Sequence, residues 1–99
     1  MAVRVYLLSY DICDARRLRA MHKIAIAHGA MLQYSLYACP LTRAQRIELK
    51  TRVENLIDRS TDRVIILDMG AAQDEGSWIP PYESLGANVA ITMRRSVVI

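Results

Sequence analysis

The sequence predicts an α+β fold, because short apolar segments with strand character alternate with two helical patterns along its 99 residues. Residues 3–10 and 64–69 are rich in the Val, Ile, Leu and Tyr side chains that strands favour. Helical periodicity covers residues 15–28 and about 42–59, and residues 30–39 return as extended chain between them. If residues 30–39 supply two strands, the order is the βαββαβ plan of a ferredoxin-like sandwich.

The first predicted strand, residues 3–10, is apolar on both faces. Val5 and Leu7 point to one face, whereas Tyr6 and Leu8 point to the other, because side chains alternate along a strand. This pattern is typical of a strand that is covered on both sides.

The first helix is expected to run from about Ala15 to His28. Asp14 stands at the N-cap position, where a carboxylate accepts from a free backbone amide. Gly29 is expected to end the helix in the left-handed conformation. The predicted buried stripe consists of Leu18, Met21, Ile24 and Ala25.

Residues 30–39 are extended, but their pattern leaves two arrangements open. They form either one bent strand or two short strands that meet near residues 34–35. No Asn-Gly pair marks a tight hairpin turn there. Pro40 is expected to end the segment.

The second helix begins at a capping box formed by Thr42 and Gln45, and it is expected to reach about Arg59. A strand apolar on both faces follows at residues 64–69. Gly70 is expected to close that strand. The chain is therefore interpreted as one domain with its core in the part up to this glycine.

Residues 71–99 form a connector with glycine and proline punctuation, followed by strand character at 89–92 and 96–99. We expect one extra C-terminal strand from this part of the chain. Three apolar side chains in the connector are expected to pack either on the domain's own core or on another chain: Trp78, Ile79 and Tyr82.

Two helices cover only one face of a four-stranded sheet, yet the strands at 3–10 and 64–69 are apolar on both faces. An exposed apolar patch of that size is rare on a monomer. We therefore expect the uncovered face to meet a second copy in a two-fold homodimer.

Composition excludes several classes of protein. The sequence contains neither a run of apolar residues long enough for a membrane span nor a signal-peptide pattern, so we expect a cytoplasmic protein without membrane contact. Cys13 and Cys39 are expected to be reduced thiols, and with His22 and His28 they form no zinc pattern. Eleven of the thirteen cations are Arg, which favours a polyanionic partner.

Asp11 is the candidate catalytic and metal-binding residue. It follows a strand directly and, unlike Asp14, has no capping duty. In a two-fold dimer, two Asp11 carboxylates brought together would repel each other unless a cation bridged them. Mg2+ suits that role, because it takes one or two carboxylates together with water and phosphate oxygens.

Three arginines at the start of the first helix are the candidate phosphate anchors: Arg16, Arg17 and Arg19. Cations are mildly unfavourable at a helix N-terminus, which suggests that they serve another purpose. Tyr10 is a candidate for stacking on a base, with a place in the core as the alternative. His22 and His28 are interpreted as bystanders.

The sequence also resembles the CRISPR-associated protein 2 family, the small subunit of the machinery that captures new spacers. The resemblance runs over residues 3–70 and rests on Tyr10-Asp11-Ile12, Asp14, Arg16-Arg17, Gly29, Gln33-Tyr34-Ser35-Leu36-Tyr37 and Asp62-Arg63-Val64-Ile65. It implies a ferredoxin-like homodimer with a Mg2+-dependent nuclease site at the dimer axis. The implied substrates are single-stranded RNA or double-stranded DNA.

The resemblance also implies a scaffold role, in which the dimer holds DNA between copies of the CRISPR integrase subunit. Three functions therefore remain open from the sequence: a Mg2+-dependent endonuclease of CRISPR adaptation, a non-catalytic DNA-holding scaffold, and a toxin-type RNA-cleaving enzyme of the same fold. Arginine contacts to the backbone suit both RNA and DNA, so the sequence does not choose between these substrates.

Overall fold

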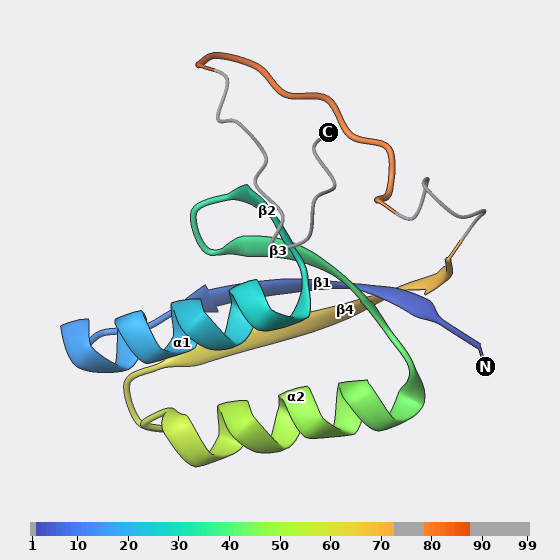
Figure 1. Cartoon of the computed structure of the whole chain (residues 1–99). Coiled ribbons are helices and arrows are strands. Elements are labelled where there is room, and N and C mark those ends of the chain that lie inside the picture. The colour runs from blue at the N-terminus through green and yellow to red at the C-terminus, as the bar shows by residue number, and fades with distance from the viewer. Residues whose placement is uncertain (1, 73–78, 88–99) are drawn as a thin grey trace.

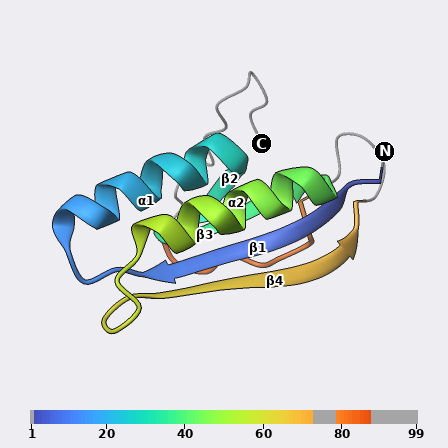
Figure 2. The ribbon, with the colours of Figure 1, turned by 90° about the horizontal axis from the view of Figure 1, so that it is seen from below.

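The computed structural model describes residues 2–72 and 79–87 of the chain. Four strands form one antiparallel sheet in the order β2-β3-β1-β4, and both helices lie on the same face of it (Figures 1 and 2). This arrangement confirms the predicted α+β, ferredoxin-like βαββαβ sandwich. The elements are β1 (Arg4–Asp11), α1 (Ala15–His28), β2 (Ala30–Gln33), β3 (Leu36–Leu41), α2 (Arg43–Leu56) and β4 (Arg63–Ala71).

The hydrophobic core lies between the sheet and the two helices. Central strand β1 contributes its even-numbered side chains, Tyr6, Leu8 and Tyr10, and all three are buried. Helix α1 adds Met21 and helix α2 adds Leu49, both fully buried. The core therefore fills one face of β1, as its alternation predicts.

The bounds predicted for α1 are confirmed, and Asp14 is its N-cap. Leu18, however, is 40% exposed and does not join the buried stripe. The first turn of α1 extends beyond the end of β1, so no strand lies beneath it (Figures 1 and 2). The stripe begins one turn later, at Met21 and Ala25.

Gly29 does not adopt the predicted left-handed conformation, because its backbone is extended at φ −166° and ψ −167°. Its requirement is space. A Cβ at this position would meet the backbone carbonyl of Ala38 and would lie 2.6 Å from the Cys39 sulfur. The glycine therefore lets the end of α1 approach β3 closely.

We expect Gly29→Ala to destabilise the protein by about 3 kcal/mol, because a backbone carbonyl cannot move aside as a flexible side chain can. Urea unfolding followed by circular dichroism measures this change. Gly70→Ala is the contrast: its Cβ would meet nothing within 4 Å, and only the positive φ of 99° opposes it, at about 1–2 kcal/mol. A Gly29→Ala variant as stable as wild type would contradict the close approach.

Residues 30–39 form two strands, which settles the alternative left open by the sequence. The turn between them places Ser35 at φ 64°. Pro40 does not end the segment, because β3 continues to Leu41 and Pro40 pairs with Val5. Strand β2 has already ended its pairing at this point of β3, so the missing amide of Pro40 costs no ladder hydrogen bond on that side.

Helix α2 begins with the predicted capping box, in which both the Thr42 and Gln45 side chains accept from backbone amides. It ends at Leu56, three residues before the predicted end. Strand β4 continues through Gly70 rather than stopping there. Positive φ at Gly70 accompanies a register shift against β1, so this glycine forms a bulge within the strand.

The face of the sheet opposite the helices, called the open face below, carries exposed apolar side chains on β4. Ile65, Leu67 and Met69 are 46%, 51% and 49% exposed. Residues 79–87 lie on this side of the molecule, and there Tyr82 and Leu85 are also exposed (Figures 1 and 2). The connector therefore does not bury these two side chains in the domain's own core.

The predicted extra C-terminal strand and Trp78 lie outside the described residues. Neither α1 nor α2 has the length and apolar character of a membrane-crossing helix, and this holds for the described part of the chain.

Candidate functional site

Asp11 is the last residue of β1 and is exposed. It lies opposite Arg63, the first residue of β4, so the two side chains project from the same face of the sheet. By alternation from the buried Tyr10, this is the open face. Within residues 2–72 and 79–87, no hydrogen bond or ion pair occupies the Asp11 carboxylate. It is free to bind a cation.

The turn after Asp11 is held by a second acid, Asp62, whose side chain is fully buried. One carboxylate oxygen of Asp62 accepts from the backbone N–H of Cys13 at 2.9 Å, and the other accepts from the N–H of Asp58 at 2.9 Å. The Cys13 thiol also donates to the Thr61 carbonyl at 3.0 Å. The loop before β4 thereby fixes the turn that carries Asp11.

Arg17 completes this arrangement. Its Nε donates to Asp62 at 2.7 Å and its Nη2 donates to the other carboxylate oxygen at 3.2 Å, which is a bidentate pair. The Arg17 hydrogen bonds, together with those from backbone amides, hold the pKa of Asp62 well below its usual range. The guanidinium is therefore engaged inside the protein. A phosphate contact by Arg17 stays a prediction that this placement does not favour.

The other two predicted anchors are placed differently. Arg16 and Arg19 are exposed on α1, and neither forms an ion pair within the part of the chain that the structure describes. Asp14 accepts from the backbone N–H of Arg17 at 2.9 Å, so its carboxylate is used as the predicted cap. Arg17 is therefore used inside the protein, whereas Arg16 and Arg19 are free of ion pairs within the described residues.

Tyr10 lies in the core and is 6% exposed. Its ring stacks on Tyr37 with centroids 6.2 Å apart, and the Tyr37 hydroxyl is 2.9 Å from Nδ1 of His22. Burial raises the pKa of both tyrosines. A ring enclosed in this way presents no face to a base, so base stacking by Tyr10 stays a prediction that its burial does not favour.

A metal ion at this site would need ligands from beyond one chain. Among the described residues, no three His, Cys, Asp or Glu side chains are arranged so that they could hold a metal ion. A single exposed carboxylate nevertheless fits Mg2+, which is a hard cation that keeps water and phosphate oxygens among its ligands. The buried Cys39 thiol is no competing ligand, because burial raises its pKa to about 12. The donor chemistry is compatible with the predicted Mg2+.

Sequence reasoning gave no role to Asp62 or Arg63, although both belong to the stretch that carries the family resemblance. The signal for Asp62 was an acid directly before an apolar strand, which sequence alone does not distinguish from a solvated loop residue. Arg63 becomes notable only through its register opposite Asp11. Both roles depend on strand pairing between distant segments.

Comparisons with known proteins show the family of the chain. The sequence profile of the family described as CRISPR associated protein Cas2 matches residues 4–76. The CRISPR-associated endoribonuclease Cas2 1 of Rhodospirillum rubrum is 36% identical over 98 residues, which cover 99% of this chain and 93% of the relative. The CRISPR-associated endoribonuclease Cas2 of Geobacter sulfurreducens is 30% identical over 95 residues, covering 96% of this chain and 97% of the relative.

Solved structures show the same fold. A crystal structure of Streptococcus pyogenes Cas2 superimposes with a TM-score of 0.67 at 26% identity, covering 83% of this chain and 99% of that chain. A hypothetical protein from Thermus thermophilus gives a TM-score of 0.72 at 23% identity, with 91% of this chain and 99% of that chain covered. The profile match, the two relatives and the shared fold together show that the chain belongs to the CRISPR associated protein Cas2 family.

Proposed function

We propose that this protein is a cytoplasmic, Mg2+-dependent endonuclease of CRISPR adaptation that acts as a homodimer. One observation carries the proposal: Asp11 is an exposed carboxylate with no partner among the described residues, on a turn that the buried Asp62 holds in place. The endoribonuclease names of the relatives from R. rubrum and G. sulfurreducens support the reaction class.

Dimerisation is supported by the open face. Asp11 projects from the same face as the exposed Ile65 and Leu67, so a second copy covering these side chains would bring its own Asp11 to the interface. The exposed Tyr82 and Leu85 lie on that side as well and would gain a surface to cover them. A two-fold arrangement then supplies two carboxylates where one chain has one.

In this dimer the paired Asp11 carboxylates would hold Mg2+. When bound, the ion would supply Lewis acidity at the scissile phosphate and lower the pKa of a coordinated water. Arg16 and Arg19 would bind phosphates next to the scissile one and position the strand without reading its sequence. Asp62 and Arg17 would keep the turn rigid, so that Asp11 loses little freedom on binding.

The direct test is a Mg2+ titration of the purified protein with end-labelled single-stranded RNA and double-stranded DNA of the same sequence. We expect cleavage that rises with Mg2+, stops in EDTA and prefers one substrate. Cleavage that continues in EDTA would contradict a metal-dependent site.

A non-catalytic scaffold for the CRISPR integrase subunit is the second candidate. It is favoured by Arg16 and Arg19, which stay exposed and unpaired within the described residues and do not depend on Asp11. Spacer insertion in cells separates the two functions. The scaffold function predicts that insertion survives Asp11→Asn and fails in the Arg16→Gln/Arg19→Gln variant.

The proposed dimer also predicts how a substitution on the open face changes the oligomeric state. Leu67→Glu places a charge in the interface, and we expect the protein to elute as a monomer in size-exclusion chromatography with light scattering. Ile47→Glu is the matched control, because Ile47 is 47% exposed on α2, away from the open face. A Leu67→Glu protein that remains dimeric would show that the dimer uses another surface.

A further inference from the structure

A cavity of about 700 Å3 lies between α2 and the edge of the sheet formed by β1 and β4. Its strand wall consists of helix-facing side chains, including Tyr6, Val64 and Ile66. Asp11 projects from the opposite face of the sheet, so this cavity is separate from the proposed nuclease site. We call it the α2–β4 groove.

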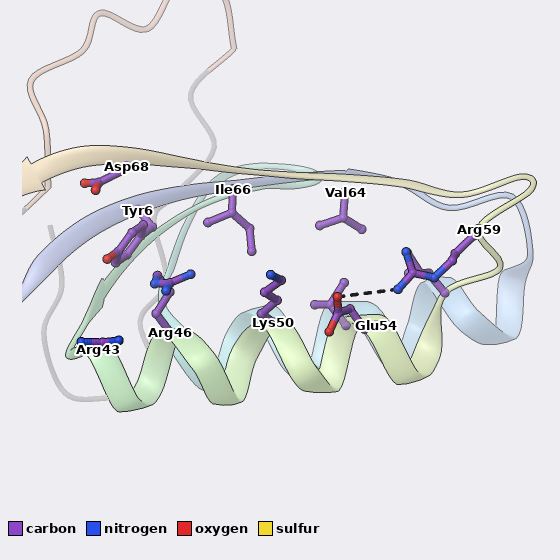
Figure 3. A pocket seen from close by; sticks show the side chains of 11 residues that line it. Tyr6, Arg43, Arg46, Lys50, Glu54, Arg59, Val64, Ile66 and Asp68 are labelled. Atoms are coloured by element: carbon purple, nitrogen blue, oxygen red, sulfur yellow. Dashed lines mark ion pairs between the residues drawn. The ribbon is translucent and has the colours of Figure 1, made fainter.

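Three cations from α2 line the groove in a row: Arg43, Arg46 and Lys50 (Figure 3). Arg46 and Lys50 point from the helix toward the strands (Figure 3). At a rise of about 1.5 Å per residue, the row from Arg43 to Lys50 extends roughly 10 Å along the helix axis. Within the described residues, none of the three has a carboxylate within 4 Å.

The carboxylates of the groove are already engaged elsewhere. Asp68 pairs with Arg4 at 3.1 Å, and Glu54 pairs with Arg59 at 3.6 Å. The backbone amide of Gly70, followed by Arg4, lowers the pKa of Asp68, which therefore stays ionised. Both carboxylates of the groove are thus already paired, so they do not neutralise the three cations from α2.

We propose that the α2–β4 groove is a second nucleic-acid contact, which binds the sugar-phosphate backbone of one strand. This inference rests on the proposed nucleic-acid function of the protein. A row of cations matches a linear polyanion better than a single phosphate ion, for which a convergent cluster would suffice. The apolar wall of Val64 and Ile66 gives the sugars a surface that needs no hydrogen bonds.

The test measures binding of the full chain to fluorescent double-stranded DNA and single-stranded RNA by anisotropy in EDTA, over a series of salt concentrations. Arg46→Gln is compared with Arg52→Gln, which removes the same charge from the same helix at an exposed site beside Glu48. If Arg46 binds a phosphate, its removal lowers the slope of log affinity against log salt by about 0.9 for duplex and about 0.7 for a single strand. Adding Lys50→Gln should double that change.

We expect the Arg46→Gln/Lys50→Gln protein to bind about tenfold more weakly, and Arg52→Gln to bind like wild type. Equal losses in Arg46→Gln and Arg52→Gln would reduce the effect to net charge and overturn the inference. Unchanged nucleic-acid binding by the Arg46→Gln/Lys50→Gln protein would also overturn the inference. This holds even if that protein loses binding to a labelled poly-glutamate peptide. A wild-type protein that binds neither nucleic acid would refute the proposed function itself, and the groove with it.

Discussion

Asp11→Asn is expected to lower Mg2+-dependent cleavage by about a hundredfold or more, because it removes the carboxylate that would hold the ion. The exposed side chain makes no hydrogen bond within the described residues, so the thermal midpoint should stay within about 2 °C of wild type. Cleavage of labelled RNA and DNA at saturating Mg2+, measured beside circular dichroism melting, checks both statements.

The matched control is Asp14→Asn, which changes an acid only three residues away. Asn caps a helix about as well as Asp, so the hydrogen bond to the Arg17 amide is retained. Cleavage by this variant should remain near the wild-type rate. If the Asp11→Asn protein cleaves as fast as wild type, the observed nuclease lies elsewhere or is a contaminant.

Asp62→Asn is expected to destabilise the protein strongly, because it leaves the partly buried Arg17 guanidinium against a neutral amide. The Asp62 carboxylate accepts several hydrogen bonds, and both of its oxygens are used. The amide of Asn would place its NH2 group, which only donates, against one of the donors. We expect the thermal midpoint to fall by roughly 10 °C. Cleavage should fall too, since the turn that carries Asp11 loses its anchor.

Asp68→Asn is the control for this prediction. Its pair with Arg4 is half exposed on both sides, at 49% and 48%, and such surface pairs contribute little. Its midpoint should move by only a few degrees. Equal effects in the two variants would contradict the anchoring role of Asp62.

The loss of folding stability at acid pH should depend on Asp62 as well. Its pKa is depressed in the folded protein, so unfolding lets the carboxylate take up a proton near its ordinary pKa of about 3.9. The contribution is therefore complete above about pH 5 and is lost as the pH falls toward the folded-state pKa. Asp62→Asn should weaken the dependence of the free energy of unfolding on pH, measured by urea unfolding between about pH 3 and pH 7. An unchanged pH dependence in this variant would assign the loss of stability to other acids.

Local chemistry predicted the helices well. The Asp14 cap and the box of Thr42 and Gln45 depend only on residues within one turn, and both form as predicted. The same locality explains the errors. Gly29 and Pro40 carry local preferences that were overruled by contacts with β3 and by the start of β2 at Ala30, opposite Ala38, which leaves Pro40 without a partner in β2; no local pattern encodes either feature.

The sequence by itself determined the two helices, the two-sided apolar strands on either side of them and Asp11 as an acid without a capping duty, because periodicity and capping act over a few neighbouring residues. Only the tertiary structure decided that Arg17 binds Asp62 while Arg16 and Arg19 stay free, and that the cations of α2 line a groove. The Arg17–Asp62 pair joins segments more than forty residues apart in the sequence. Charge and spacing along the chain do not specify which distant carboxylate will neutralise which arginine.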